Sequence, residues 1–195
     1  LIALYNDDAP ESAHVLWAKP LTYGGLAGGN MGDHAFSCGD AYEGKFASPV
    51  IIGGVLFYNN YQSRMPQDGI IAVDLHTGEE LWSRNNSIVS FGQVFYWDSY
   101  NMHSVFGYVW ETSGSTWKAY DPFTGDWVYT MEGVPSGSAR FGASYTVRGP
   151  KGEILIYETD IANGWMALWN SSRVVSDRGS WRPQGEIYNC SYSSP

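Results

Sequence analysis

The sequence is poor in charge, and most of the charge it has is negative. Only 16% of its 195 residues are Asp, Glu, Lys or Arg, against about 25% in an average soluble protein. This scarcity argues against long exposed helices, which need a charged face toward water. The formal net charge is −9. Because phosphate binding needs a basic surface, we expect no nucleic-acid partner.

Long apolar runs and helical periodicity are also missing. No apolar run approaches the ~20 residues of a membrane-spanning helix, so we expect no transmembrane segment in this chain. No stretch longer than a turn repeats its apolar residues with a helical period. The chain does hold 23 Gly and 16% aromatic residues. Many glycines and aromatics in a charge-poor chain predict short strands joined by tight turns, which is an all-β fold.

Cysteine is scarce, with Cys38 and Cys190 as the two residues of this type. A disulfide between them would close most of the chain into one loop, and the alternative is two free buried thiols. Three Asn-x-Ser sequons, at Asn85, Asn170 and Asn189, favour an extracellular or cell-surface setting with attached glycans. That setting favours the disulfide, although a glycan on Asn189 would compete with a bond at the adjacent Cys190.

Two segments of the chain repeat each other, residues 70–84 and residues 117–131, at an offset of 47 positions. The offset lies in the range of about 40–50 residues that four-stranded propeller blades occupy. The matched positions are Ala72, Asp74, Thr77, Gly78 and Trp82 in the first copy, and Ala119, Asp121, Thr124, Gly125 and Tyr129 in the second.

Each copy is typical of a β-hairpin with a defined turn. Ala72 and Asp74 lie near the end of one strand, and Gly78 allows a positive φ in the turn. The Asp74 carboxylate can accept hydrogen bonds from turn amides and hold the corner. Trp82, on the returning strand, is large enough to pack between neighbouring blades. One such motif predicts a hairpin, and two copies at blade spacing predict stacked blades.

Weaker copies flank this pair. Ala167 lies 48 positions beyond Ala119, but its turn has Asn170-Ser171-Ser172 in place of Asp-x-x-Thr-Gly. At the front of the chain, residues 2–5 and 15–17 resemble the same hairpin with a longer turn. We therefore expect Trp17 to take the place of Trp82 in a preceding blade.

The remaining strands of each blade are expected between these hairpins. They are predicted at residues 49–58 with a turn at Gly53-Gly54, at 90–97 and 104–110, and at 141–147 and 153–157. Residues 21–47 form a Gly-rich insertion, and residues 173–195 lose the repeat pattern. The chain is therefore predicted to be a single β-propeller segment, residues 1–195, of about three to four blades with a period of about 47 residues.

The pattern Ala-x-Asp-x-x-Thr-Gly-x-x-x-Trp, complete at residues 72–82, resembles the tryptophan-docking motif of quinoprotein propellers, the PQQ-like repeat family. The copy at residues 119–129 keeps this motif except for Tyr129. The resemblance covers residues 1–170 and implies blades of four antiparallel strands. The family includes pyrroloquinoline-quinone dehydrogenases, outer-membrane assembly scaffolds and secreted archaeal and bacterial proteins. The aromatics, sequons and Gly-rich insertion are most similar to the last group.

The resemblance does not extend to the catalytic parts of the family. Its alcohol dehydrogenases have an adjacent Cys-Cys disulfide, a Ca²⁺ site of Glu, Asn and Asp, and a catalytic Asp. Here Cys38 and Cys190 are 152 positions apart, and no Glu/Asn/Asp set matches residue by residue. A ring of about eight blades is also needed to enclose the quinone. No Gly-x-Ser-x-Gly elbow is present. We expect no cofactor and assign no catalytic residue.

Three groups of residues are candidate sites, each with a simpler alternative. Asp33, His34, Asp40 and Glu43 in the insertion are metal-ligand types without EF-hand or His-x-x-x-His spacing, so the alternative is a solvated loop. Asp98, Tyr100, Asn101 and His103 form either a ligand-facing rim loop or a polar turn. The third group is the surplus of tryptophan, which serves either blade packing or stacking on sugar rings: Trp97, Trp110, Trp117, Trp127, Trp165, Trp169 and Trp181.

These patterns predict a non-catalytic extracellular β-propeller module for protein–protein binding or for surface or filament assembly. A partial propeller leaves strand edges and inter-blade aromatics that further sequence, another chain or self-association must cover. Two alternatives stay open. One is a fragment of a PQQ-dependent dehydrogenase, and the other is a carbohydrate-binding module.

Overall fold

The computed structural model describes residues 12, 14–19, 48–60, 69–137, 139–140, 143–144, 146–176 and 179–191. Strands dominate these ranges, and the one helix within them is the five-residue α1, Ser171–Val175. The predicted all-β class is confirmed. The predicted Gly-rich insertion at residues 21–47 lies outside the described residues.

The first sheet has four antiparallel strands that pair in sequence order. They are β1 (Val50–Ile52), β2 (Val55–Asn59), β3 (Gly69–Asp74) and β4 (Glu80–Asn85). The predicted turn between β1 and β2 is present because Gly53 and Gly54 adopt φ values of 59° and 81°. A sheet of four antiparallel strands is the unit that the repeat spacing predicted.

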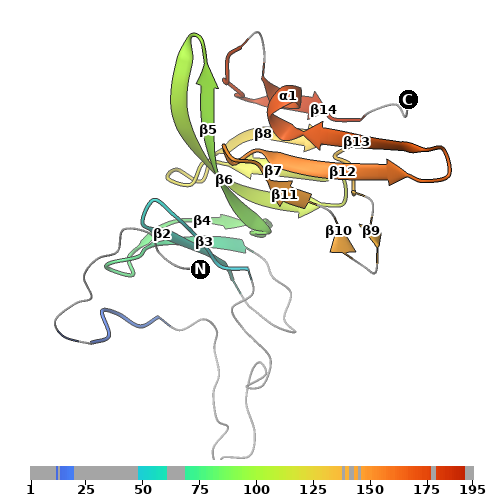
Figure 1. The fold of residues 1–195 in the computed structure, drawn as a ribbon. Helices are drawn as coiled ribbons and strands as arrows, with labels where there is room; N and C mark the ends of the chain where they lie inside the picture. The colour runs from blue at the N-terminus through green and yellow to red at the C-terminus, as the bar shows by residue number, and fades with distance from the viewer. Residues whose placement is uncertain are drawn as a thin grey trace, which may run out of the picture.

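The second sheet repeats this arrangement and adds a strand. It contains β5 (Phe91–Ser99), β6 (Met102–Ser113), β7 (Thr116–Tyr120) and β8 (Trp127–Glu132), again paired in sequence order. A fifth strand, β14 (Glu186–Asn189), pairs with β8 in parallel. The sequence did not predict β14, because residues 173–195 carry no repeat pattern. The β5–β6 hairpin extends beyond the rest of its sheet (Figure 1).

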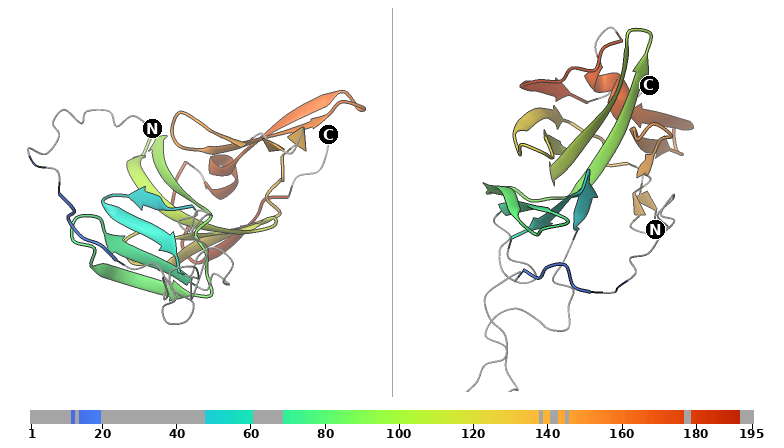
Figure 2. Two further views of the ribbon diagram at one scale, coloured as in Figure 1. Left: turned by 90° about the horizontal axis from the view of Figure 1, so that it is seen from below. Right: turned by 90° about the vertical axis from the view of Figure 1, so that its left-hand side faces the viewer.

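The third sheet has three strands, β11 (Thr146–Arg148), β12 (Ile154–Asp160) and β13 (Trp165–Asn170). A separate short pair, β9 (Ala139–Arg140) and β10 (Ala143–Ser144), precedes it. Where the sequence predicted a turn, Asn170 begins α1, since its side-chain oxygen accepts the amide of Ser172 at 2.9 Å. The chain therefore leaves the sheet after β13, and the β12–β13 hairpin projects from the body (Figure 2).

The three sheets stack in a row, with one apolar core on each side of the second sheet (Figure 1). Neighbouring residues of a strand point to opposite faces, so Val109 packs toward the first sheet and Trp110 toward the third. The core between the first and second sheets includes Phe57, Ile70, Ala72, Val109 and Tyr120. The core between the second and third includes Trp110, Tyr129, Ile154, Ile156, Trp169 and Trp181.

The described sheets pair within themselves and do not close into a ring. The finer prediction, that these sheets are propeller blades, therefore stays a prediction. Within the described ranges, no helix has the length and apolar character needed to cross a membrane.

Candidate interaction site

The first repeat ends in a turn held by one carboxylate, and residues 74–79 are called the first turn. The Oδ1 atom of Asp74 accepts the amides of His76 at 2.9 Å and Thr77 at 2.8 Å, and also the Thr77 hydroxyl at 3.1 Å. The Thr77 hydroxyl in turn accepts the amide of Glu79 at 3.2 Å. These hydrogen bonds, led by the one from the Thr77 amide, lower the pKa of Asp74 below its ordinary value.

The second repeat builds the same turn from residues 121–126, called the second turn. The Oδ1 atom of Asp121 accepts the amides of Phe123 at 2.8 Å and Thr124 at 2.9 Å. The Thr124 hydroxyl accepts the amide of Asp126 at 3.2 Å. Gly78 and Gly125 each adopt φ of 74°. The hairpin repeat predicted from the sequence is confirmed in backbone and side-chain geometry.

The paired strands of the two repeats also match. Ala72 lies opposite Trp82, and Ala119 lies opposite Tyr129. In both hairpins the register shifts directly after the alanine. Both alanines are fully buried. The small side chain lets its neighbours pack closely, which explains why both copies have alanine at this position.

Trp82 connects the first sheet to the second turn. Its indole Nε1 donates to the carbonyl of Pro122 at 3.0 Å. Its ring lies so close to Gly125 that an added Cβ there would be 2.7 Å from the indole Cδ2. Arg84, two residues on, donates Nε and Nη2 to the Gly125 carbonyl at 3.0 and 2.7 Å. This arrangement, an indole over the turn glycine with its N–H on a turn carbonyl, is called docking below.

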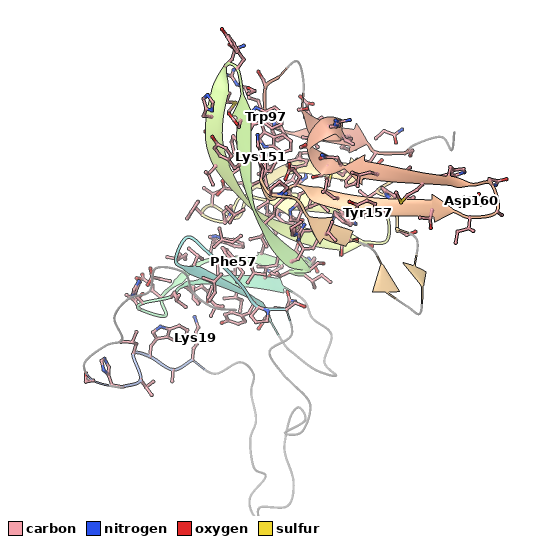
Figure 3. All side chains as sticks on the ribbon, in the orientation of Figure 1. Lys19, Phe57, Trp97, Lys151, Tyr157 and Asp160 are labelled. Atoms are coloured by element: carbon pink, nitrogen blue, oxygen red, sulfur yellow. The ribbon has the colours of Figure 1, made fainter. Side chains whose placement is uncertain are left out.

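Trp17 docks on the first turn in the same way. Its indole Nε1 donates to the carbonyl of Leu75 at 2.8 Å, and a Cβ added to Gly78 would lie 2.6 Å from its ring. Lys19 then forms an ion pair with Glu80 at 3.5 Å (Figure 3). Leu75 and Gly78 precede Pro122 and Gly125 by the 47 positions of the repeat. The predicted docking contact of Trp17 is therefore present, whereas residues 2–5 of the predicted preceding hairpin lie outside the described residues.

Tyr129 occupies the same position in the second repeat and does not dock. It is fully buried, and its ring meets those of Tyr108, Trp110 and Tyr188 edge-on at 5.4, 5.4 and 5.9 Å. This burial raises the pKa of Tyr129 well above its ordinary value. The docking series therefore stops at the second sheet.

The C-terminal segment covers the side of the second sheet where docking stops. Main-chain bonds flank the β14–β8 pair, from Gly185 to Val128 at 2.7 Å and from Cys190 to Glu132 at 2.6 Å. The Cys190 thiol is buried, and burial raises its pKa to about 11. Cys38 lies outside the described residues, so the Cys38–Cys190 disulfide stays a prediction.

A groove of about 630 Å³ opens between β6, the second turn and residues 181–184. Its walls carry aromatic rings and both signs of charge, from Phe106, Tyr108, Asp121, Phe123, Trp181 and Arg182. Trp181 donates its indole N–H to the Tyr108 hydroxyl at 2.8 Å. Burial raises the pKa of Tyr108 to about 12. The sequence did not predict this groove, because its two sides come from segments more than 50 residues apart.

The Asp98 carboxylate braces the tip of the β5–β6 hairpin. Asp98 lies 2.7 Å from His103 Nδ1 and 3.2 Å from the Nζ atom of Lys151 on the β11–β12 turn. Lys151 is labelled in Figure 3. The hydrogen bond from Lys151 is the main cause that lowers the pKa of Asp98. Tyr100 and Asn101 are exposed at the tip. Because the Asp98 carboxylate already has two partners, the geometry favours a polar turn over a ligand-facing loop.

The predicted metal ligands are not tested by this structure. Asp33, His34, Asp40 and Glu43 lie outside the described residues. Among the residues that are described, no group of three or more His, Cys, Asp or Glu is placed to hold a metal ion.

The predicted glycosylation sites differ in exposure. Asn85 ends β4 and is exposed, and Asn189 ends β14 and is exposed. The Asn170 side chain is half-buried, because it caps α1 and also accepts the Ser172 hydroxyl at 2.7 Å. Asn85 and Asn189 are thus the sequons with the better access, and their use stays a prediction.

Packing accounts for part of the tryptophan surplus. Trp110, Trp169 and Trp181 are buried in the core between the second and third sheets. Trp97 contacts Trp181 and donates its N–H to the Gly179 carbonyl at 3.3 Å. Trp127 is the most exposed of the group. Trp117 packs against Trp110, with ring centroids 6.1 Å apart.

Comparison with known proteins gives no family for this chain. A scan against protein-family models found no match, and a search of curated proteins found no significant one. The PQQ-like repeat family therefore stays a prediction. What the geometry offers is two sheets joined by the docked indole of Trp82, a second indole, Trp17, docked on the first sheet, an aromatic groove, and strands with exposed apolar side chains.

Proposed function

We propose that this chain is a non-catalytic, extracellular β-propeller module of the PQQ-like repeat type that binds protein partners or assembles on a surface. The docking series carries the proposal. Trp17 and Trp82 each place an indole on the turn of the following sheet, with matching bonds to Leu75 and Pro122. Repeated sheets that stack on one another by a common contact are the packing scheme of propellers.

Exposed apolar side chains support a binding role. Val94 and Tyr96 on β5 and Val105 on β6 are exposed on the long hairpin, and Met166 and Leu168 are exposed on β13. Apolar residues gathered on strands at the margin of a sheet are typical of surfaces that pair with another chain.

Two titratable groups of the groove, Asp121 and Tyr108, have structural partners, which favours binding over catalysis. Asp121 accepts the amides of the second turn, and the Tyr108 hydroxyl accepts the Trp181 indole N–H. A general acid or base must be free to meet a substrate proton. The alternative of a PQQ-dependent dehydrogenase predicts dye reduction when PQQ and Ca²⁺ are added to the purified chain.

Sedimentation velocity over a wide range of concentrations tests the assembly role, together with the intact mass of the secreted chain. We expect species heavier than the 21.6 kDa polypeptide, with added glycan mass at the exposed sequons. A bare 21.6 kDa monomer at every concentration would contradict assembly. Cofactor-dependent dye reduction would contradict the non-catalytic assignment.

The groove favours a second candidate function, which is carbohydrate binding. Sugar rings stack on aromatic faces, and their hydroxyls bind charged side chains such as Asp121 and Arg182. Phe123 is 61% exposed at the rim of the groove. If a glycan array detects a ligand, Phe123→Ala should weaken binding at least tenfold. Tyr100→Ala, at the exposed β5–β6 tip, is the matched control and should bind as the wild type does.

A further inference from the structure

Among the described residues, the third sheet has no strand that corresponds to β4 of the first sheet or β8 of the second. In the first and second sheets, the hairpin turn leads into β4 or β8, which pairs with β3 or β7. In the third sheet, Asn170 begins α1 instead, and the described residues pair β13 with β12 alone. Met166 and Leu168 on β13 are 70% and 51% exposed. This open edge lies on the hairpin that projects from the body (Figure 2).

A buried donor without a partner lies at the same strand. Trp169 is 8% exposed, and among the described residues its indole Nε1 has no acceptor. A cavity of about 130 Å³ is lined by Glu158, Ala167, Leu168 and Trp169. Buried polar groups in proteins are nearly always hydrogen-bonded, so this N–H points to an acceptor supplied from elsewhere. The indole N–H groups of Trp17 and Trp82 each donate to a main-chain carbonyl of another segment, which is the kind of acceptor that the Trp169 N–H lacks among the described residues.

Residues 14–19 have the complementary deficiency. Trp17 docks on the first turn as Trp82 of β4 docks on the second, so this segment holds the place of an outer strand of a preceding sheet. Residues 14–19 nevertheless form no strand pair with any described residue. Val15 and Leu16 are 79% and 65% exposed. Among the described residues, the segment therefore holds the place of an outer strand but pairs with no sheet, and the third sheet has no outer strand beside β13.

We infer that residues 14–19 of a second copy of this chain pair with the open edge of β13 and complete the third sheet. The inference rests on the assembly function proposed above and names the partner. Leu16 of the added segment lies on the face of the completed sheet that carries Met166 and Leu168, while Val15 points to the opposite face, and one of the segment's carbonyls accepts the Trp169 N–H. Because the contact joins two different surfaces, it repeats from copy to copy and produces a ring or a filament.

Lysine substitutions on the two surfaces test this contact in the full chain. Lysine on an edge strand opposes pairing with another strand. We expect Leu16→Lys and Leu168→Lys each to weaken association at least tenfold in sedimentation velocity. Ile51→Lys is the matched control, since Ile51 is 57% exposed on β1 of the first sheet, and it should associate as the wild type does. All three side chains are exposed, and unchanged thermal melting would verify that each variant folds.

Mixing the two variants tests the head-to-tail arrangement directly. Each variant keeps one intact surface, so an equal mixture should form dimers of one Leu16→Lys chain with one Leu168→Lys chain and nothing longer. A mixture that stays monomeric would overturn the arrangement.

The remaining outcomes separate this inference from the function on which it rests. If the wild type associates and neither lysine variant weakens it, the inference fails, and assembly through another surface stands. If the wild type is a monomer at every concentration, the inference and the proposed assembly function both fail.

Discussion

Trp82 and Tyr129 hold the same position in two repeats and have opposite roles. Trp82 lies at the margin of the first sheet and reaches across to the second turn through its N–H and its ring. Tyr129 is enclosed within one core, edge-on to Tyr108 and Trp110. Trp82 therefore joins the first sheet to the second, whereas Tyr129 belongs to the interior of the core between the second and third sheets.

The difference follows from what comes next in the chain. Beyond Trp82 lies another sheet whose turn presents a glycine and a free carbonyl. Beyond Tyr129 the corresponding turn is replaced by α1, capped by Asn170, and β14 covers the edge of β8. A tyrosine hydroxyl and ring suit an enclosed aromatic cluster, whereas docking needs the longer indole with its N–H at the far side.

The largest loss of stability should come from removing the enclosed ring of Tyr129. Tyr129→Ala should lower the free energy of unfolding by about 3–5 kcal/mol, because a fully buried aromatic side chain leaves a cavity. Urea denaturation measures it. Tyr96→Ala, on the exposed side of β5, is the control and should cost below about 1 kcal/mol. A smaller loss at Tyr129 than at Trp82→Ala would show that docking outweighs the enclosed cluster.

The glycine under a docked indole should give the next largest effect. Gly125→Ala combines a positive φ with a collision against the Trp82 ring, so we expect a cost of roughly 2–4 kcal/mol. Gly114→Ala is the matched control, since Gly114 has φ of 58° and nothing within 4 Å of an added Cβ. It should cost about 1–2 kcal/mol from backbone strain alone. Equal losses in urea unfolding would mean that the indole contact contributes nothing.

Exchanging tryptophan and tyrosine between positions 82 and 129 should lower the free energy of unfolding by less than the substitutions above. Tyr129→Trp overfills an enclosed core, for about 1–3 kcal/mol. Trp82→Tyr removes the hydrogen bond to Pro122, for about 1 kcal/mol. Thermal melting of the two variants measures both losses of stability. A stabilising Tyr129→Trp would show that the second repeat also accepts a docking residue.

The smallest effect should be a pH-dependent one at the first turn. The lowered pKa of Asp74 means that its carboxylate stabilises the fold fully above its ordinary pKa of 3.8. That contribution is lost as the pH falls through the lower folded-state value. Asp74→Asn should therefore be less stable than the wild type at neutral pH, with the gap closing below pH 3.8. A gap that stays constant with pH in urea unfolding would contradict this role of the charge.

Sequence reasoning predicted the parts of the fold that depend on local chemistry. The Asp-x-x-Thr-Gly turns were predictable because a carboxylate, a hydroxyl and a glycine satisfy the turn within six residues. Trp17 was found by analogy with Trp82, since each directly follows a leucine at the end of a hairpin-like segment. The candidate groove was not predictable, because Phe123 and Trp181 meet only when the C-terminal segment folds over β6.

The sequence by itself determined the all-β class and the two equivalent hairpins, because these rest on contacts within one repeat and on its 47-residue period. The tertiary structure alone decided that β14 pairs in parallel with β8, that Tyr129 is enclosed, and that β13 has no fourth strand beside it among the described residues. Strand pairing between distant segments depends on which edge and which apolar face are available after the repeats have stacked. That availability is a property of the assembled sheets and has no local signature in the chain.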